Sequence, residues 1–193
     1  MNAAITPRPG MRCFSVRHED EWACICVEGW ERPRNDGSAC YVGEVLIHSS
    51  FGSYAHQWGA MGVPVEQFLA QIECGYAATK FLGAKASVFS ESRTRANILD
   101  HLRRYRRQGR LTLQQARVFW GSIQADHFPD EEAAVRSMRE AAENAGIESH
   151  SLTLVDEPWD VLRNEPNPAF SRFWDTLWRP FVAHLQASTT AAA

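Results

Sequence analysis

The period of the hydrophobic pattern changes at Pro64, and this change constrains the fold more than any other feature of the chain. Before it, apolar residues tend to alternate with other residues, as Ala23, Ile25 and Val27 do within 22–28, and a period of two is typical of strands. Beyond Pro64 apolar residues recur every three to five positions, which is typical of amphipathic helices. We therefore predict an α+β fold, in which an N-terminal antiparallel sheet of three or four strands packs against a helical C-terminal half.

Turn signals divide the N-terminal region into strands. Residues 18–20 separate two short runs and indicate a hairpin turn, while residues 29–38 contain an Asp-Gly pair, a common hairpin signal. The chain then returns and is followed by a possible fourth strand, which would complete an antiparallel meander. The predicted strands are 11–17, 21–28, 39–48 and 53–58.

The C-terminal half contains several helix boundaries. Pro64 suits a first helical turn and Gly83 a stop, and Thr112 with Gln115 forms a capping-box pattern that predicts a helical hairpin around Gly109. Gly146 is typical of a helix end, and Pro180 predicts a kink or restart near residue 179. The predicted helices are 64–82, 92–108, one opening at 112, 130–144 and 170–185, with possible strands at 85–89 and 151–155.

Length and composition indicate one domain. The chain has 193 residues, of which 45% are hydrophobic and 22% charged; this predicts a single α+β domain over 11–187, sheet-rich over 11–62 and helix-rich over 63–187. The ends, 1–10 and 188–193, are expected to be flexible. No apolar stretch reaches the roughly 20 residues that span a bilayer, so neither secretion nor membrane insertion is expected.

The cysteine pattern indicates a reducing compartment. Five cysteines are present, an odd number, and no two have the C-x-x-C spacing. Cys24 and Cys26 lie two apart in a strand and share one face, where packing as small apolar side chains is favoured over metal binding. The sequence indicates no cofactor and no metal site.

Arginines are concentrated in the second predicted helix. Seven lie between Arg93 and Arg110, with Asp100 as the single acidic residue among them. Such a stripe suits nucleic-acid backbone or an acidic protein surface. The competing interpretation is a solvated face neutralised by Asp126, Asp130, Glu131 and Glu132, and Tyr105 is the single aromatic residue between the arginines, which weakens the nucleic-acid hypothesis. The candidate binding residues are Arg103, Arg104, Arg106, Arg107 and Arg110.

A polar segment follows the third predicted strand. It could supply a nucleophile and a base, which would make the protein a small hydrolase or transferase, or it could be a structural polar network. No Gly-x-Ser-x-Gly elbow accompanies it, and no acid has a recognisable spacing, so catalysis is the weaker hypothesis. The candidate residues are His48, Ser50, Ser53, Tyr54 and His56.

An aromatic stripe marks the C-terminal helix. Packing onto the protein's own core is favoured, and a partner or dimer surface is the alternative. The candidate contact residues are Trp174, Trp178 and Phe181, and the sequence leaves the oligomeric state open.

Four phrases carry a resemblance to a known family: EWACICV, GEVLIHSSFGSYAHQWGAMG, a helix that begins PVEQFL, and RRQGRLTLQQARVFW. Together they resemble small accessory proteins that tailed bacteriophages and prophages encode. The resemblance covers residues 21–123 and assigns no catalytic residues.

The resemblance implies a phage product that works in the cytoplasm of the infected bacterial host. Such proteins often bind a host component stoichiometrically, and they include inhibitors of CRISPR interference. The leading hypothesis is a non-enzymatic counter-defence protein that binds a host protein or ribonucleoprotein complex, and the second is direct binding of DNA or RNA by the arginine helix.

Overall fold

The computed structural model describes residues 8–33, 39–148 and 151–190, and these form two compact units. The first combines the chain up to Ala86 with the chain from Pro166 onward, and the second is residues 87–165. The single domain predicted over 11–187 stays a prediction, and within it the described chain divides into these two compact units. Each unit has its own cluster of buried apolar residues. The sequence did not indicate this division, because composition and periodicity do not show which helices share a core.

The first unit contains the four-stranded antiparallel meander that the alternating pattern predicts. Its strands are β1 (Arg12–His18), β2 (Glu21–Pro33), β3 (Ala39–Ser49) and β4 (Gly52–Met61), hydrogen-bonded in the order β1-β2-β3-β4. The expected turn over residues 18–20 is present, with Glu19 at a φ of 53°. The expected Asp-Gly turn lies outside the described residues.

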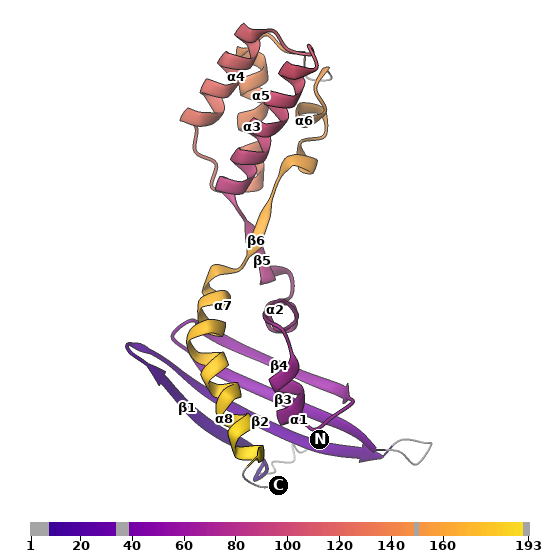
Figure 1. Ribbon diagram of the computed structural model, residues 1–193, viewed down its shortest axis with the longest axis vertical. Helices are drawn as coiled ribbons and strands as arrows, with labels where there is room; N and C mark the ends of the chain where they lie inside the picture. The colour runs from indigo at the N-terminus through magenta and orange to yellow at the C-terminus, as the bar shows by residue number, and fades with distance from the viewer. Residues whose placement is uncertain (1–7, 34–38, 149–150, 191–193) are drawn as a thin grey trace, which may run out of the picture. The chain divides into compact units, whose positions relative to one another are not determined.

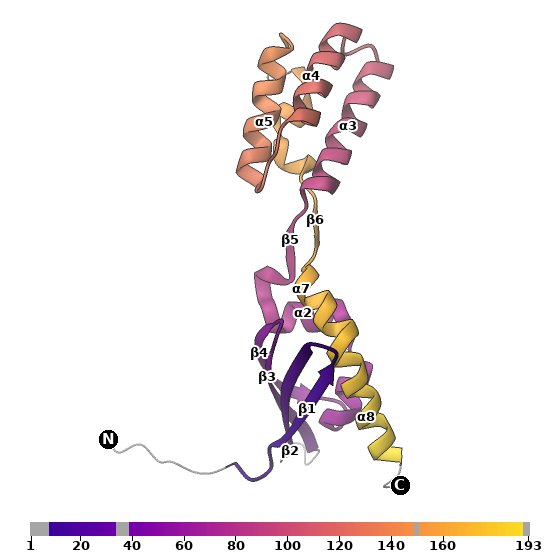
Figure 2. The ribbon, with the colours of Figure 1, turned by 90° about the vertical axis from the view of Figure 1, so that its left-hand side faces the viewer.

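One face of this sheet carries the core. Ile25, Val27, Val45 and Ile47 are at most 3% exposed and belong to the same buried cluster. Helices α1 (Val65–Gln71), α2 (Cys74–Leu82) and α8 (Arg179–Thr190) lie over this face (Figures 1 and 2). Burial of apolar surface between one sheet face and the helices is therefore the main stabilising contribution in this unit.

The opposite face carries a disulfide between Cys13 and Cys26, which are directly opposed on β1 and β2. The expectation of reduced thiols packed as apolar side chains is corrected, because Cys24 is exposed and Cys26 is bonded. The register explains the pairing. A turn that pairs His18 with Glu21 also places residues 13 and 26 opposite each other, where side chains are close enough to bond.

The helix predicted over 64–82 is two helices. α1 ends at Gln71 and α2 begins at Cys74, because Ile72 and Glu73 adopt extended backbone conformations. The predicted stop at Gly83 is confirmed, since this residue follows α2 with a φ of 57°. The break lets both short helices contact the curved sheet.

The C-terminal helix consists of three segments: α7 (Pro168–Phe173), the π-helical η4 (Trp174–Trp178) and α8. The restart predicted near residue 179 is confirmed, because α8 begins at Arg179, directly before Pro180. The proline has no N–H to donate, and a wider π turn accommodates it. Residues 188–190, expected to be a flexible tail, continue α8.

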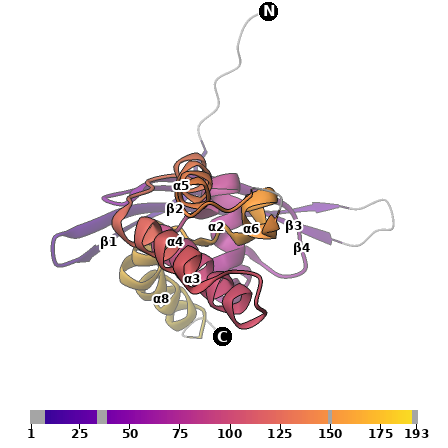
Figure 3. The same ribbon diagram turned by 90° about the horizontal axis from the view of Figure 1, so that it is seen from above.

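The second unit is mainly helical (Figure 3). Its helices are α3 (Glu91–Arg107), α4 (Leu113–Ala125), α5 (Glu131–Asn144), α6 (Thr153–Asp156) and the 3-10 helix η3 (Pro158–Val161). The short strands β5 (Ser87–Phe89) and β6 (Asn164–Pro166) pair where the chain enters and leaves this unit. The predicted strand over 151–155 is wrong, because that segment contains α6, and its apolar Leu154 and Val155 are buried against the helices.

Candidate functional site

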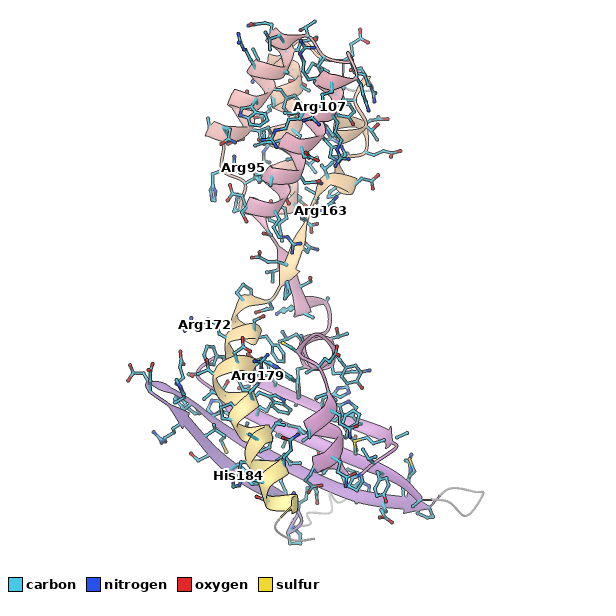
Figure 4. All side chains as sticks on the ribbon, in the orientation of Figure 1. Arg95, Arg107, Arg163, Arg172, Arg179 and His184 are labelled. Carbon is cyan, nitrogen blue, oxygen red and sulfur yellow. A yellow bond between two sulfur atoms is a disulfide. The ribbon has the colours of Figure 1, made fainter. Side chains whose placement is uncertain are left out.

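The arginine helix is the first half of a helical hairpin. α3 buries Ile98 and Leu102 in the core of the second unit, so its arginines occupy the exposed side. The predicted capping box is present at the start of α4: Thr112 accepts from the backbone of Gln115, and the Gln115 side chain accepts from the backbone of Thr112. This cap holds the end of the hairpin at which the arginines are concentrated. Figure 4 labels Arg95 near the start of α3 and Arg107 at its end.

The structure separates the five predicted arginines into two groups. Arg104 donates to Asp100 over 2.6 Å, and Arg110 donates to the carbonyl of Ser151 over 2.6 Å while lying against the ring of Tyr105. These two side chains have partners within the protein. Three others line a groove between α3 and α4: Arg103, Arg106 and Arg107.

The groove has a volume of about 420 Å³, an apolar floor and basic walls. Arg117, Trp120 and Gly121 of α4 contribute to it, at the same i, i+3, i+4 spacing as the three arginines of α3. Residues at this spacing share one face of a helix, so two matching faces meet across the groove. The remaining lining residues are Leu102 and Ala116.

The groove arginines have few internal partners. The Arg103 guanidinium lies over the Trp120 ring, 4.8 Å from its centroid. In the part of the chain that the structure describes, the side chains of Arg106, Arg107 and Arg117 form no ion pair and no hydrogen bond. Neighbouring cations without counter-charges repel each other, and a bound anion would relieve this cost.

The acidic residues expected to neutralise the arginines are engaged elsewhere. Asp130 accepts from the backbone of Ala133 and caps α5, whose first turn contains Glu131 and Glu132. A hydrogen bond from Ser137 holds the pKa of Asp126 below its usual value. Among the described residues, none of these carboxylates pairs with an arginine of the groove.

Sequence reasoning missed the α4 side of the groove. Tyr105, the aromatic residue noted among the arginines, is buried, whereas Trp120 supplies the accessible ring from the next helix. The signal was present in the spacing of Arg117, Trp120 and Gly121, which repeats that of the α3 arginines. Tyr105 is the single aromatic residue among these arginines along the sequence, and Trp120 of α4 is a second aromatic neighbour in the structure.

Of the five polar candidates around β3 and β4, His48, Ser53 and Tyr54 line one shallow pocket, and the two histidines lie apart. His48 pairs with Ser53 on the exposed face of the sheet, whereas His56 pairs with Val45 on the core face. Because side chains alternate between faces, the two histidines lie on opposite sides of the sheet. The structure therefore does not bring the two histidines together in one site, whereas His48 and Ser53 share a face of the sheet.

Ser50 and Tyr54 of this polar set have structural partners. Ser50 donates to the carboxylate of Glu21 and also accepts from the backbone of Trp22. The buried Tyr54 hydroxyl donates to the carbonyl of Phe51 over 2.9 Å, and burial raises the pKa of Tyr54. Burial, followed by the charge of Lys80, lowers the pKa of His56. These contacts match the interpretation as a structural network.

The aromatic tail lies in the core of the first unit. Trp174, Trp178 and Phe181 are 7%, 1% and 2% exposed. Trp178 stacks on Trp174 with ring centroids 5.4 Å apart and also contacts Phe181. These residues therefore pack on their own sheet, and they do not form the exposed contact surface considered as the alternative.

Metal-binding clusters and membrane-spanning helices are both absent from the described residues. No group of three or more His, Cys, Asp or Glu there is arranged to hold a metal ion. No helix in the same residues is both long and apolar enough to cross a bilayer.

Comparison with known proteins identifies a family. A family model described as "Phage family" matches residues 18–186, which cover most of the chain, all of the second unit and most of the first. Neither the curated proteins nor the solved structures contain a significant match. The α3–α4 groove lies within the matched region.

Proposed function

Since the chain belongs to this phage family, we propose that it is a phage accessory protein that acts by binding nucleic acid through the arginine groove of α3 and α4. The observation that carries the proposal is the set of three arginines, Arg106, Arg107 and Arg117, without internal counter-charges beside an apolar groove. Phosphate groups supply the missing negative charge, and bases supply a flat apolar surface.

The counter-defence role stays a prediction. Stoichiometric inhibition of a host protein or ribonucleoprotein complex in the infected cell, including a CRISPR effector, would use the same groove against an acidic surface or a bound RNA. Among the described residues, none outside the groove favours inhibition of a host complex over a general nucleic-acid function.

Binding is tested by fluorescence anisotropy with a labelled oligonucleotide over a KCl series. Three phosphate contacts to single-stranded nucleic acid predict a slope of about −2 in log K against log salt, or roughly a 20-fold loss between 50 and 200 mM. The double variant Arg106→Glu, Arg107→Glu should abolish this binding. A matched control, Arg136→Glu with Arg139→Glu, makes the same change of charge on exposed residues of α5 and should retain most of it.

An affinity capture distinguishes direct nucleic-acid binding from binding to a host protein complex. Tagged protein is recovered from a lysate that contains an active CRISPR effector, with and without nuclease, and bound molecules are identified by mass spectrometry. Recovery of nucleic acid that depends on the α3 arginines supports the proposal. A stoichiometric protein partner that survives nuclease, together with no oligonucleotide binding at low salt, would replace it with protein binding.

A further inference from the structure

We infer that the groove receives an unpaired nucleobase, so that the protein selects single-stranded over double-stranded nucleic acid. This inference rests on the proposed function, because it specifies which form of nucleic acid the same groove binds. It is carried by the floor of the groove, and not by the charges of its walls.

Gly121 opens the floor at a position where a helix would favour another residue. It lies in the interior of α4, where glycine costs about 1 kcal/mol relative to alanine. A Cβ built at this position meets no atom within 4 Å, so the glycine is not required by packing within the unit. The missing side chain leaves space at the groove, as is common where a ligand approaches the backbone closely.

Trp120 and Arg103 line the groove beside Gly121. The guanidinium lies over the indole at 4.8 Å from the ring centroid. Both groups are planar, and single-stranded bases stack on aromatic rings and on guanidinium planes. A base beside Gly121 would therefore stack against this pair, while Leu102 and Ala116 provide apolar contact.

The unpaired arginines surround this position on both helices. Arg106 and Arg107 come from α3 and Arg117 from α4, so cations lie on both walls of the groove. The phosphates that flank an inserted base are negatively charged on both sides of it, which matches this placement. In a duplex the bases are stacked inside the helix, and inserting one requires several kcal/mol of unpairing and unstacking.

The test compares polyanions that differ in whether they present unpaired bases. Wild-type protein is titrated with a single-stranded oligonucleotide, an abasic strand of the same length, the duplex and poly-glutamate. The variant Gly121→Met fills the floor with a good helix former, and Gly75→Met makes the same change in α2 at a glycine that also has no atom within 4 Å of its Cβ position.

We expect Gly121→Met to weaken single-strand binding by on the order of tenfold, the value of one lost stacking interaction, with the salt slope unchanged. Wild type should bind the abasic strand and the duplex about as weakly as Gly121→Met binds the single strand. Gly75→Met should bind like wild type. Thermal melting of Gly121→Met should be no lower than that of wild type, which separates a blocked groove from a damaged fold.

Three results would overturn the inference. Equal binding of single strand, duplex and abasic strand, unaffected by Gly121→Met, would remove the base site but leave salt-dependent nucleic-acid binding in place. Binding of poly-glutamate as tight as that of the oligonucleotide would make the groove a site for acidic peptides. Absence of all nucleic-acid binding at low salt would instead refute the proposed function, and this inference with it.

Discussion

Substitution of Gly43 by alanine should destabilise the first unit, mainly through a clash with Val65. Gly43 on β3 is opposite Gly29 on β2, and together they leave a notch in the sheet that holds Val65, the first residue of α1. A Cβ on Gly43 would lie 2.6 Å from Val65 Cγ2 and 2.8 Å from Met61 Cε. The methionine end can move, but Val65 is 3% exposed and held at the helix start.

The expected magnitude follows from overpacking. Inserting a methyl group into a packed core costs about 1–3 kcal/mol, so Gly43→Ala should lower the free energy of unfolding by that amount. Val65→Ala alone should cost roughly 2 kcal/mol, from two lost carbon groups and a partly filled cavity. Because the clash is then largely removed, adding Gly43→Ala to Val65→Ala should cost less than about 1 kcal/mol. With about 2 kcal/mol, the middle of the range for Gly43→Ala alone, the coupling is at least ~1 kcal/mol.

The assay is urea unfolding read by hydrogen exchange of the β2 and β3 amides, which reports on the first unit separately from the second. Gly59→Ala on β4 is the control, because its Cβ would meet no atom within 4 Å, and it should be neutral or stabilising. The reasoning is refuted if Gly43→Ala is as harmless as the control, or if its cost is the same with valine and with alanine at position 65.

Four further measurements follow from the structure. Thr112→Ala removes the capping box of α4 and should cost about 1 kcal/mol, measured by hydrogen exchange of the second unit; no change would mean that the cap contributes nothing there. Phe181→Ala, at a residue 2% exposed, should cost about 3–5 kcal/mol in urea unfolding, and a cost below 1 kcal/mol would contradict its place in the core. Burial, followed by the charge of Lys80, lowers the pKa of His56 in the folded protein, so on acidification the unfolded chain is protonated at His56 before the folded protein is. The stability that neutral His56 contributes should therefore be complete above about pH 6.5 and fall below it. His56→Gln should flatten that decline between pH 7 and 5. Denatured, unreduced protein should take up three alkyl groups on its free cysteines, and uptake of five would show that the disulfide does not form.

Local patterns predicted most of the secondary structure, because each depends on residues close together in the chain. Alternation in residues 22–28 predicted β2, and Thr112 with Gln115 predicted the start of α4. The errors arose where the outcome depends on distant residues. Neither Ile72 nor Glu73 is a helix-breaking residue, yet the chain bends there so that α1 and α2 each contact the sheet. The segment 151–155 has strand-like composition but is buried against helices of its own unit.

Only part of the candidate site could be predicted from the sequence. The arginines of α3 stand out in the sequence, but their separation into paired and unpaired members depends on partners such as the Ser151 carbonyl, 41 residues from Arg110. The polar set that includes His48 and His56 looked continuous along the chain. The strand register places these two residues on opposite faces, so proximity in sequence did not become proximity in space.

The sequence by itself determined most of the elements: where the four sheet strands and the longer helices of the second unit form, where α4 is capped, where α8 restarts, and that α3 is rich in arginine. These follow from periodicity, turn residues and caps, which act over a few residues. Only the tertiary structure decided that the chain forms two units, that the aromatic tail is buried, and that Trp120 and Gly121 face the α3 arginines across a groove. Those outcomes depend on which apolar faces bury each other, a property of the whole chain and not of any one segment.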